Sequence, residues 1–229
     1  MLAVSVHPDE FVLRKLQEFL QTALIQTDWC PKLAQLLAIF LNYGATPEQL
    51  RISPAAAAGV RTLHLVACDV KTKSQQQRPT LTHQYSAVNA VYVWQTIGEI
   101  VRYRFQQFST DDVVQLIVTC AVTSLDSRLV QCPVMNDLQV CMSVLVNAIV
   151  QQDFDDAVRC ICRCLATVTK HHHNKVHLVR IFPYVPRGRL VSRAMALVFV
   201  RQLMSDSHDV IDAECSIPVT HKVSVIRIS

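Results

Sequence analysis

Residues 7–24 read HPDEFVLRKLQEFLQTAL, and this stretch carries both parts of a helix signature. Pro8, Asp9 and Glu10 suit a first helical turn, where a missing N–H costs nothing and the helix dipole favours negative charge. After them, apolar residues recur with the period of an α-helix. These apolar residues are Phe11, Val12, Leu16, Phe19, Leu20, Ala23 and Leu24. The stretch predicts an amphipathic helix that turns them toward a core.

Residues that begin or end helices recur along the rest of the chain. Pro31 begins a second helix that Gly44 closes as a left-handed cap, and Thr46 to Gln49 resemble a capping box. Ser53 and Pro54 begin another, Ala-rich helix through about Val66. Further helices are predicted over 84–107, 111–124, 134–151, 153–170, 174–182 and 188–205. Their caps and acidic first turns come from Ser109, Thr110, Asp111 and Asp112, and from Asp153, Asp155 and Asp156. We predict an all-α fold, an irregular HEAT-like stack of antiparallel helices.

Two segments interrupt the helical pattern. Residues 71–82 read KTKSQQQRPTLT, which is polar and Gln-rich and predicts a mobile loop between two lobes, 1–70 and 83–210. From Ser216 the chain alternates apolar and polar residues as a short strand does, without an obvious partner strand. We therefore predict a helical domain over 1–210 and an irregular or disordered tail over 211–229.

The composition excludes several classes of protein. Of 229 residues, 51% are hydrophobic and 17% are charged, which excludes a disordered chain. There are four glycines and none of the GxGxxG, GxxxxGK[ST] or GxSxG patterns, so we expect no enzyme and no cofactor. No stretch predicts a signal peptide or a membrane span. The nine cysteines are an odd number, mostly within apolar runs, and predict reduced core thiols.

A metal site is the weaker interpretation of the Cys and His residues. On a helix, Cys160 and Cys164 share a face while Cys162 points away, so the three thiols cannot converge on one ion. His173 and His177 have i,i+4 spacing, but no glutamate stands between them as a metalloprotease requires. Histidines that cap a helix end explain the pattern better, and a zinc-supported fold using Cys160, Cys164, His173 and His177 remains a separate hypothesis.

Charge is distributed unevenly along the chain. Residues 157–205 contain nine basic residues and no Asp or Glu. The basic residues are Arg159, Arg163, Lys170, Lys175, Arg180, Arg187, Arg189, Arg193 and Arg201. Such a segment attracts DNA phosphates or an acidic protein, although a solvated helix face explains it equally simply. Features that read base sequence are missing, so any DNA contact would be to phosphate.

The sequence Arg187-Gly188-Arg189 predicts a turn that opens the last helix. We expect Gly188 to take backbone angles that other residues resist, and Arg187, Arg189 and Arg193 to be exposed for contact with an acidic partner or phosphate. The stripe toward the core is expected to comprise Leu190, Ala194, Leu197, Val198 and Arg201.

Two blocks of the sequence resemble a known family. One contains HHHN at 171–174, LVRIFP at 178–183, RGR at 187–189 and ALVFVRQLM at 196–204, and the other is LLAIFLNYGA at 36–45. Together they resemble the C-terminal, Nse-six-like helical domain of the SMC five–six complex localisation factor two family, over roughly residues 8–210. The blocks are structural motifs and not catalytic ones.

The resemblance implies a function. It implies a nuclear, non-enzymatic adaptor that pairs with an Nse-five-like helical protein and brings the SMC five–six complex to damaged or viral DNA. The chain departs from the family in two respects: it lacks a long polar N-terminal region, and beyond about Val210 it turns to a strand-like sequence where the family continues in helix. We therefore expect a fragment or an alternative terminus. Direct, sequence-independent DNA binding through 157–205 is the alternative function.

Overall fold

A computed structural model describes residues 9–42, 87–125, 129, 135–168, 172–183 and 185–214. Within these residues all regular secondary structure is helical and no strand occurs. The predicted all-α class is confirmed, whereas the finer HEAT-like arrangement stays a prediction.

The described helices lie close to their predicted positions. They are α1 (Glu10–Gln26), α2 (Leu33–Asn42), α4 (Ala87–Arg104), α5 (Thr110–Thr123), α6 (Met135–Ala148), α7 (Phe154–Val168), α8 (His172–Arg180) and α9 (Pro186–Glu214), with 3₁₀ turns η3 (Phe105–Gln107) and η4 (Gln151–Asp153). Helix α9 is longer than predicted and includes residues 211–214, so the prediction that these residues belong to an irregular tail is wrong. The expected Gly44 cap, the Thr46–Gln49 capping box, the Ala-rich helix, the 71–82 loop and the strand-like end lie outside the described residues.

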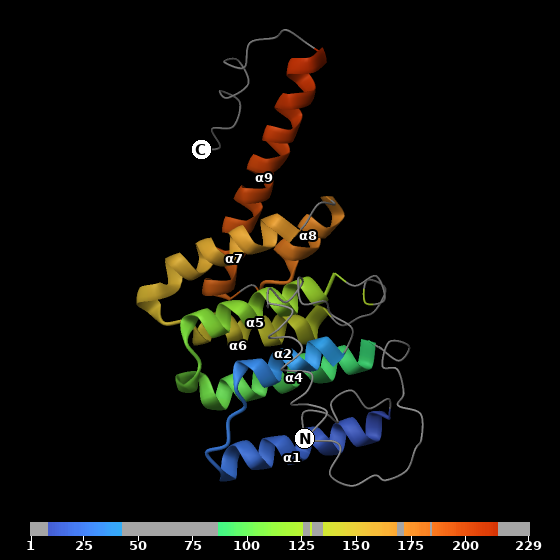
Figure 1. Cartoon of the computed structure of the whole chain (residues 1–229), viewed down its shortest axis with the longest axis vertical. Helices are drawn as coiled ribbons and strands as arrows, with labels where there is room; N and C mark the ends of the chain where they lie inside the picture. Colours follow the sequence, from blue (N-terminus) through green and yellow to red (C-terminus); the bar gives the residue numbers. More distant parts are fainter. Residues whose placement is uncertain are drawn as a thin grey trace.

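The helices are stacked in layers (Figure 1). Helix α1 lies at one end, α2 and α4 form the next layer, α5 and α6 the third, and α7, α8 and α9 the other end. The packing follows this order, because α1 contacts α4, α4 contacts α6, α5 contacts α7, and α9 contacts α6, α7 and α8. Helices on both sides of residues 71–82 pack together, and a division into two lobes stays a prediction.

Local capping explains where two of these helices begin. The carboxylate of Asp9 accepts a hydrogen bond of 2.8 Å from the backbone N–H of Phe11 and so caps α1. Before α5, the Ser109 hydroxyl accepts from the Asp112 N–H at 3.2 Å, and the Asp112 carboxylate accepts from the Ser109 N–H at 2.9 Å. This reciprocal capping box, which satisfies two N–H groups that a helix leaves unpaired, confirms the cap predicted there.

The buried face of α1 includes Leu20 and Leu24 as predicted but leaves out both phenylalanines. Leu13, Leu20 and Leu24 are buried, whereas Phe11 and Phe19 are exposed. The prediction that both phenylalanines face the core is wrong, because apolar residues surround more of α1 than the one face that packs on α4. The Phe11 ring instead lies beneath the Arg14 guanidinium, 5.6 Å from its central carbon.

One long-range contact fastens the end of α1 to the body. The Arg104 guanidinium, at the end of α4, donates to the carbonyl oxygens of Leu24 at 2.7 Å and Trp29 at 3.3 Å, and also to that of Thr27. Carbonyls at a helix C-terminus have no partners within the helix and carry partial negative charge, which an arginine satisfies and neutralises.

The core is continuous through the layers. Its largest fully buried side chain is Trp94 on α4. Cys120, Cys141, Cys162 and Cys164 are also buried, as predicted for thiols within apolar runs. None of the described helices is both long enough and apolar enough to cross a membrane.

Candidate functional site

The basic segment occupies the α7–α9 end of the stack. Arg159 and Arg163 lie on α7, and Lys175 and Arg180 on α8. The remaining described members, Arg187, Arg189, Arg193 and Arg201, lie on α9, and Lys170 is outside the described residues. Since α7, α8 and α9 form one layer, the basic residues of the segment lie at the same end of the stack.

Two of these basic side chains are engaged within the fold. Lys175 is buried, and its ammonium lies 5.9 Å from the centre of the Phe199 ring. Arg159 pairs with Asp156 at 3.3 Å on the surface of α7. Lys175 is therefore unavailable to a partner, whereas Arg159 stays exposed and its charge is only partly neutralised by Asp156.

Arg187 is predicted to face outward, but in the structure its guanidinium turns toward the end of α6. Its Nη1 donates to the carbonyl oxygens of Val146 at 3.3 Å, Asn147 at 3.2 Å and Ile149 at 2.7 Å. Its Nη2 donates to the Gln151 side chain at 2.6 Å, and its central guanidinium carbon lies 4.7 Å from the centre of the Phe154 ring. The half-buried Arg187 thus closes the C-terminus of α6, and the prediction that it is exposed is wrong.

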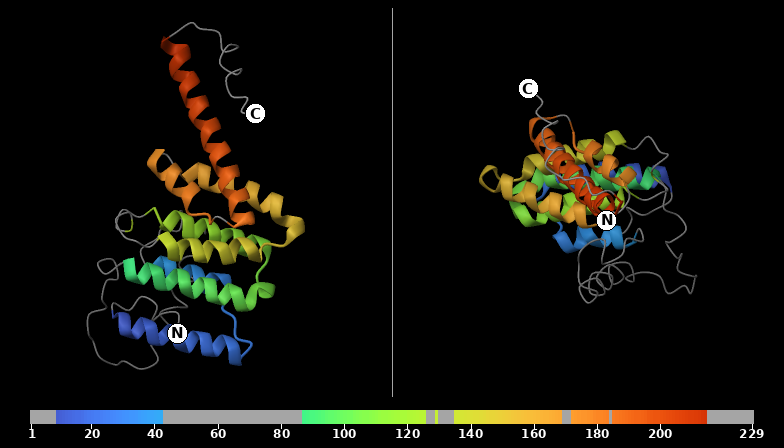
Figure 2. Two further views of the ribbon diagram at one scale, coloured as in Figure 1. Left: turned by 180° about the vertical axis from the view of Figure 1, so that it is seen from behind. Right: turned by 90° about the horizontal axis from the view of Figure 1, so that it is seen from above.

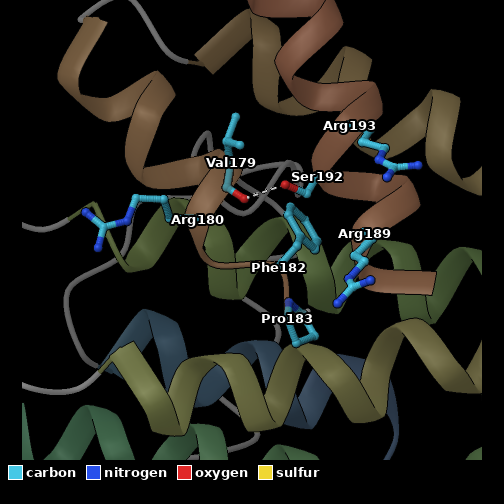
Figure 3. Close-up of a pocket in the computed structure, with 7 residues that line it drawn as sticks. All are labelled: Val179, Arg180, Phe182, Pro183, Arg189, Ser192 and Arg193. Carbon is cyan, nitrogen blue, oxygen red and sulfur yellow. Dashed lines mark hydrogen bonds between the residues drawn. The ribbon is translucent and has the colours of Figure 1, made fainter. Parts of the chain in front are cut away.

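Arg189 and Arg193 are exposed, as predicted, beside a pocket between α8 and α9 (Figure 3). The pocket has a volume of about 400 Å³ and is lined by Val179, Arg180, Phe182, Pro183, Arg189, Ser192 and Arg193. Ser192 donates its hydroxyl hydrogen to the Val179 carbonyl at 3.0 Å and fastens the two helices together. Contact of Arg189 and Arg193 with an acidic partner or phosphate remains a prediction.

Gly188 is required for a reason other than the predicted one. It lies within the first turn of α9, in helical backbone, so no left-handed conformation is involved. A Cβ atom at this position would collide with the carbonyl oxygen of Pro183 and would lie 2.9 Å from the Pro183 Cγ. Pro183, in the segment before α9, lies too close to Gly188 for any side chain at this position.

Gly188→Ala should therefore destabilise the fold, although alanine is the better helix former. Overpacking costs about 1–3 kcal/mol, which exceeds the gain in helix propensity of about 1 kcal/mol. Chemical denaturation should show a lower unfolding midpoint for the variant. An unchanged or higher midpoint would mean that the Pro183 backbone moves aside without cost.

The face of α9 that packs on the body also differs from the predicted stripe. Val191, Met195 and Phe199 are buried, and Ala194 and Val198 pack against them as predicted. Leu190, Leu197 and Arg201 are exposed, so the prediction that they face the core is wrong. The pattern was misassigned because α9 carries apolar residues on two faces.

The residues of the zinc hypothesis have local partners. The thiol sulfurs of Cys160 and Cys164 lie 3.9 Å apart on α7. His177 Nε2 lies 3.0 Å from the Ser124 hydroxyl oxygen, whose own hydrogen is donated to the Ala121 carbonyl at 2.7 Å. The His173 side chain lies outside the described ones, and the described residues bring no three His, Cys, Asp or Glu side chains together as a metal site.

His177 should make stability depend on pH. Burial and the nearby Arg180 charge lower the pKa of His177 in the folded chain. In the unfolded chain His177 has a pKa of about 6.5, so around this pH the unfolded chain binds more protons than the folded one. The free energy of unfolding therefore falls as the pH drops through this value toward the lower pKa of the folded chain. His177→Gln, which keeps a donor for Ser124, should show a shallower loss of melting temperature between about pH 7.5 and pH 5.5. Equal losses in both proteins would contradict this assignment.

The fold and the exposed arginines define the class of protein: a stack of α-helices with arginines on the exposed surface of α9. The model of the coiled-coil and Nse interacting (CANIN) domain family matches residues 4–209, and the chain belongs to that family. The family resemblance recognised in the two sequence blocks is thereby confirmed.

Two similar proteins bear the same name. The SMC5-SMC6 complex localization factor protein 2 of Mus musculus is 23% identical over 222 residues, covering 90% of this chain and 17% of its own length. The protein of that name from Homo sapiens is 21% identical over 221 residues, covering 90% of this chain and 19% of its own length. The chain thus spans less than a fifth of either relative. No solved structure matches it.

Proposed function

We propose that this domain is a non-enzymatic nuclear adaptor that helps to localise the SMC5-SMC6 complex by pairing with an Nse-five-like helical protein. The observation that carries the proposal is the CANIN family match over residues 4–209, almost the whole described fold. The names of the relatives, which are localisation factors of that complex, support the same role. Recruitment to damaged or viral DNA would follow from the complex that the adaptor holds.

Affinity purification from nuclear extract tests the proposal. The tagged full chain should recover SMC5-SMC6 subunits together with a helical protein of the Nse-five type, identified by mass spectrometry. Met195→Asp, which is expected to unfold the α7–α9 layer, provides the negative control. Recovery no greater than with this variant would overturn the proposal.

Sequence-independent DNA binding is a second candidate, favoured by the exposed arginines of the basic segment. Among the described residues, no ion pair neutralises Arg163, Arg180, Arg189, Arg193 or Arg201. Titration of a labelled duplex at two salt concentrations tests it, because phosphate contacts weaken with a slope of about −0.9 per neutralised phosphate on a logarithmic scale. An absence of binding at low salt would eliminate this candidate.

A further inference from the structure

The face of α9 that points away from the core carries a row of exposed apolar side chains. Its members are Leu190 (51% exposed), Leu197 (62%), Val200 (48%) and Met204 (44%), here called the α9 seam. Isolated exposed leucines are ordinary, but several apolar side chains along one helix face commonly mark an interaction surface, here interrupted once by Arg193 between Leu190 and Leu197.

The spacing of the α9 seam is that of a coiled coil. Leu190, Leu197 and Met204 are seven residues apart, and Val200 stands three residues after Leu197. A repeat of this kind keeps one stripe of a helix facing a neighbouring helix over successive turns. At about 100° per residue, the seam lies roughly opposite the face formed by Val191, Met195 and Phe199. Helix α9 therefore has one apolar face for the core and a second for another helix.

The charges beside the seam have one sign. Arg189 lies on one side of it and Arg201 on the other, Arg193 stands within it three residues after Leu190, and residues 186–205 contain no Asp or Glu. Residues that flank a coiled-coil seam form ion pairs that select the partner. The partner that complements these flanks is an acidic helix.

A helix fits this surface better than a phosphate group does. Arg180 and Arg193 point away from one another across the α8–α9 pocket, so these guanidinium groups do not converge on one anion (Figure 3). The apolar seam would also gain nothing from phosphate, whereas burial against apolar side chains stabilises association. Arginines spread along a helix match carboxylates spread along another.

The position of α9 leaves room for such a neighbour. Its C-terminal part extends well beyond α7 and α8, as the views in Figures 1 and 2 agree. A second helix could lie along several turns of α9 without displacing the rest of the stack.

We infer that the α9 seam binds an amphipathic helix of a partner protein, with apolar residues at heptad spacing and Asp or Glu beside them. The inference rests on the proposed adaptor function in one respect, since it supplies the surface through which the adaptor holds a helical partner. Arg189 and Arg201 then act by pairing with carboxylates beside the partner's apolar stripe, and Arg193 offers a further positive charge within the seam.

Designed peptides test the seam directly. The probe is a labelled synthetic helix of about four heptads with Leu and Ile in its seam and Glu at its flanks. One control peptide has Lys at the flanks, and another has the Glu flanks with a polar seam. Fluorescence anisotropy should show binding of the first peptide alone. Equal binding of the Lys-flanked peptide would overturn the inference, as would no binding of the first.

Variants of the chain locate the binding surface. Leu197→Asp should weaken peptide binding by about 10-fold or more, as expected for a central apolar contact, without lowering the melting temperature. Phe19→Asp is the matched control, because Phe19 is 61% exposed on α1 at the other end of the stack. Arg189→Glu with Arg193→Glu should weaken binding mainly at low salt. Loss of binding in Phe19→Asp but not Leu197→Asp would overturn the assignment.

Two further measurements separate this inference from its alternatives. Sedimentation that shows a dimer of this chain, abolished by Leu197→Asp, would overturn it by making a second copy the occupant. If Leu197→Asp recovers SMC5-SMC6 subunits from nuclear extract as well as the unmodified chain does, the inference about the α9 seam is wrong and the proposed function is unaffected. Peptide binding without such recovery would leave the seam standing and remove the function.

Discussion

Arg187→Ala is expected to lower the free energy of unfolding by about 2–3 kcal/mol and the melting temperature by about 5–10 °C. The guanidinium donates to three carbonyls at the end of α6 and to Gln151, and it lies over the Phe154 ring. Hydrogen bonds to a charged group are worth more than neutral ones, and their loss leaves half-buried carbonyls unpaired. A positive charge at the beginning of α9 opposes that helix's own dipole, but beside the end of α6 it is favourable.

Two matched variants make this expectation specific. Arg189→Ala removes an exposed arginine from the same turn and should change stability by no more than about 0.5 kcal/mol. Arg187→Lys keeps the charge but not the planar fork of donors, so its stability should be intermediate. Urea denaturation of all three variants measures the differences, and equal midpoints for Arg187→Ala and Arg189→Ala would contradict the capping role.

Helix positions could be predicted because the signals that set them are local. Ser109 and Asp112 are three residues apart, and their capping box needs nothing from elsewhere in the chain. Pro186 is the first residue of α9, and proline suits the first helical position. Such patterns are satisfied within one turn, so the sequence alone reveals them.

The roles of the arginines could not be predicted in the same way. Arg187 contacts carbonyls at positions 146, 147 and 149, and Arg104 reaches those at 24, 27 and 29. A backbone carbonyl has no sequence signature, so only the packing of α9 beside α6, and of α4 beside α1, shows where these guanidinium groups bind. The charge pattern of the sequence therefore does not distinguish Arg187, which caps α6, from an exposed arginine.

The orientation of α9 was ambiguous for a different reason. Two apolar stripes run along this helix, one through Val191, Met195 and Phe199 and one through Leu190 and Leu197, and periodicity gives both the same helical signature. Contacts of α9 with α6, α7 and α8 decide which stripe is buried. The seven-residue spacing of Leu190 and Leu197 is present in the sequence, but spacing alone does not distinguish a face that packs on the core from an exposed one.

Met195→Asp is expected to destabilise the fold by more than about 4 kcal/mol, enough to unfold the α7–α9 layer. Met195 is fully buried on the face of α9 that packs against the body, so the new carboxylate must either be ionised without a partner or take up a proton at a cost. Leu197→Asp places the same group two residues further along, where the side chain is 62% exposed and the carboxylate stays hydrated. The free energy of unfolding of that variant should lie within about 1 kcal/mol of the value for the unmodified chain, because surface substitutions rarely cost more. Circular dichroism during heating and urea titration distinguishes the two proteins. A tolerated Met195→Asp together with an unfolded Leu197→Asp would mean that α9 packs through its other face, and the seam would then belong to the core.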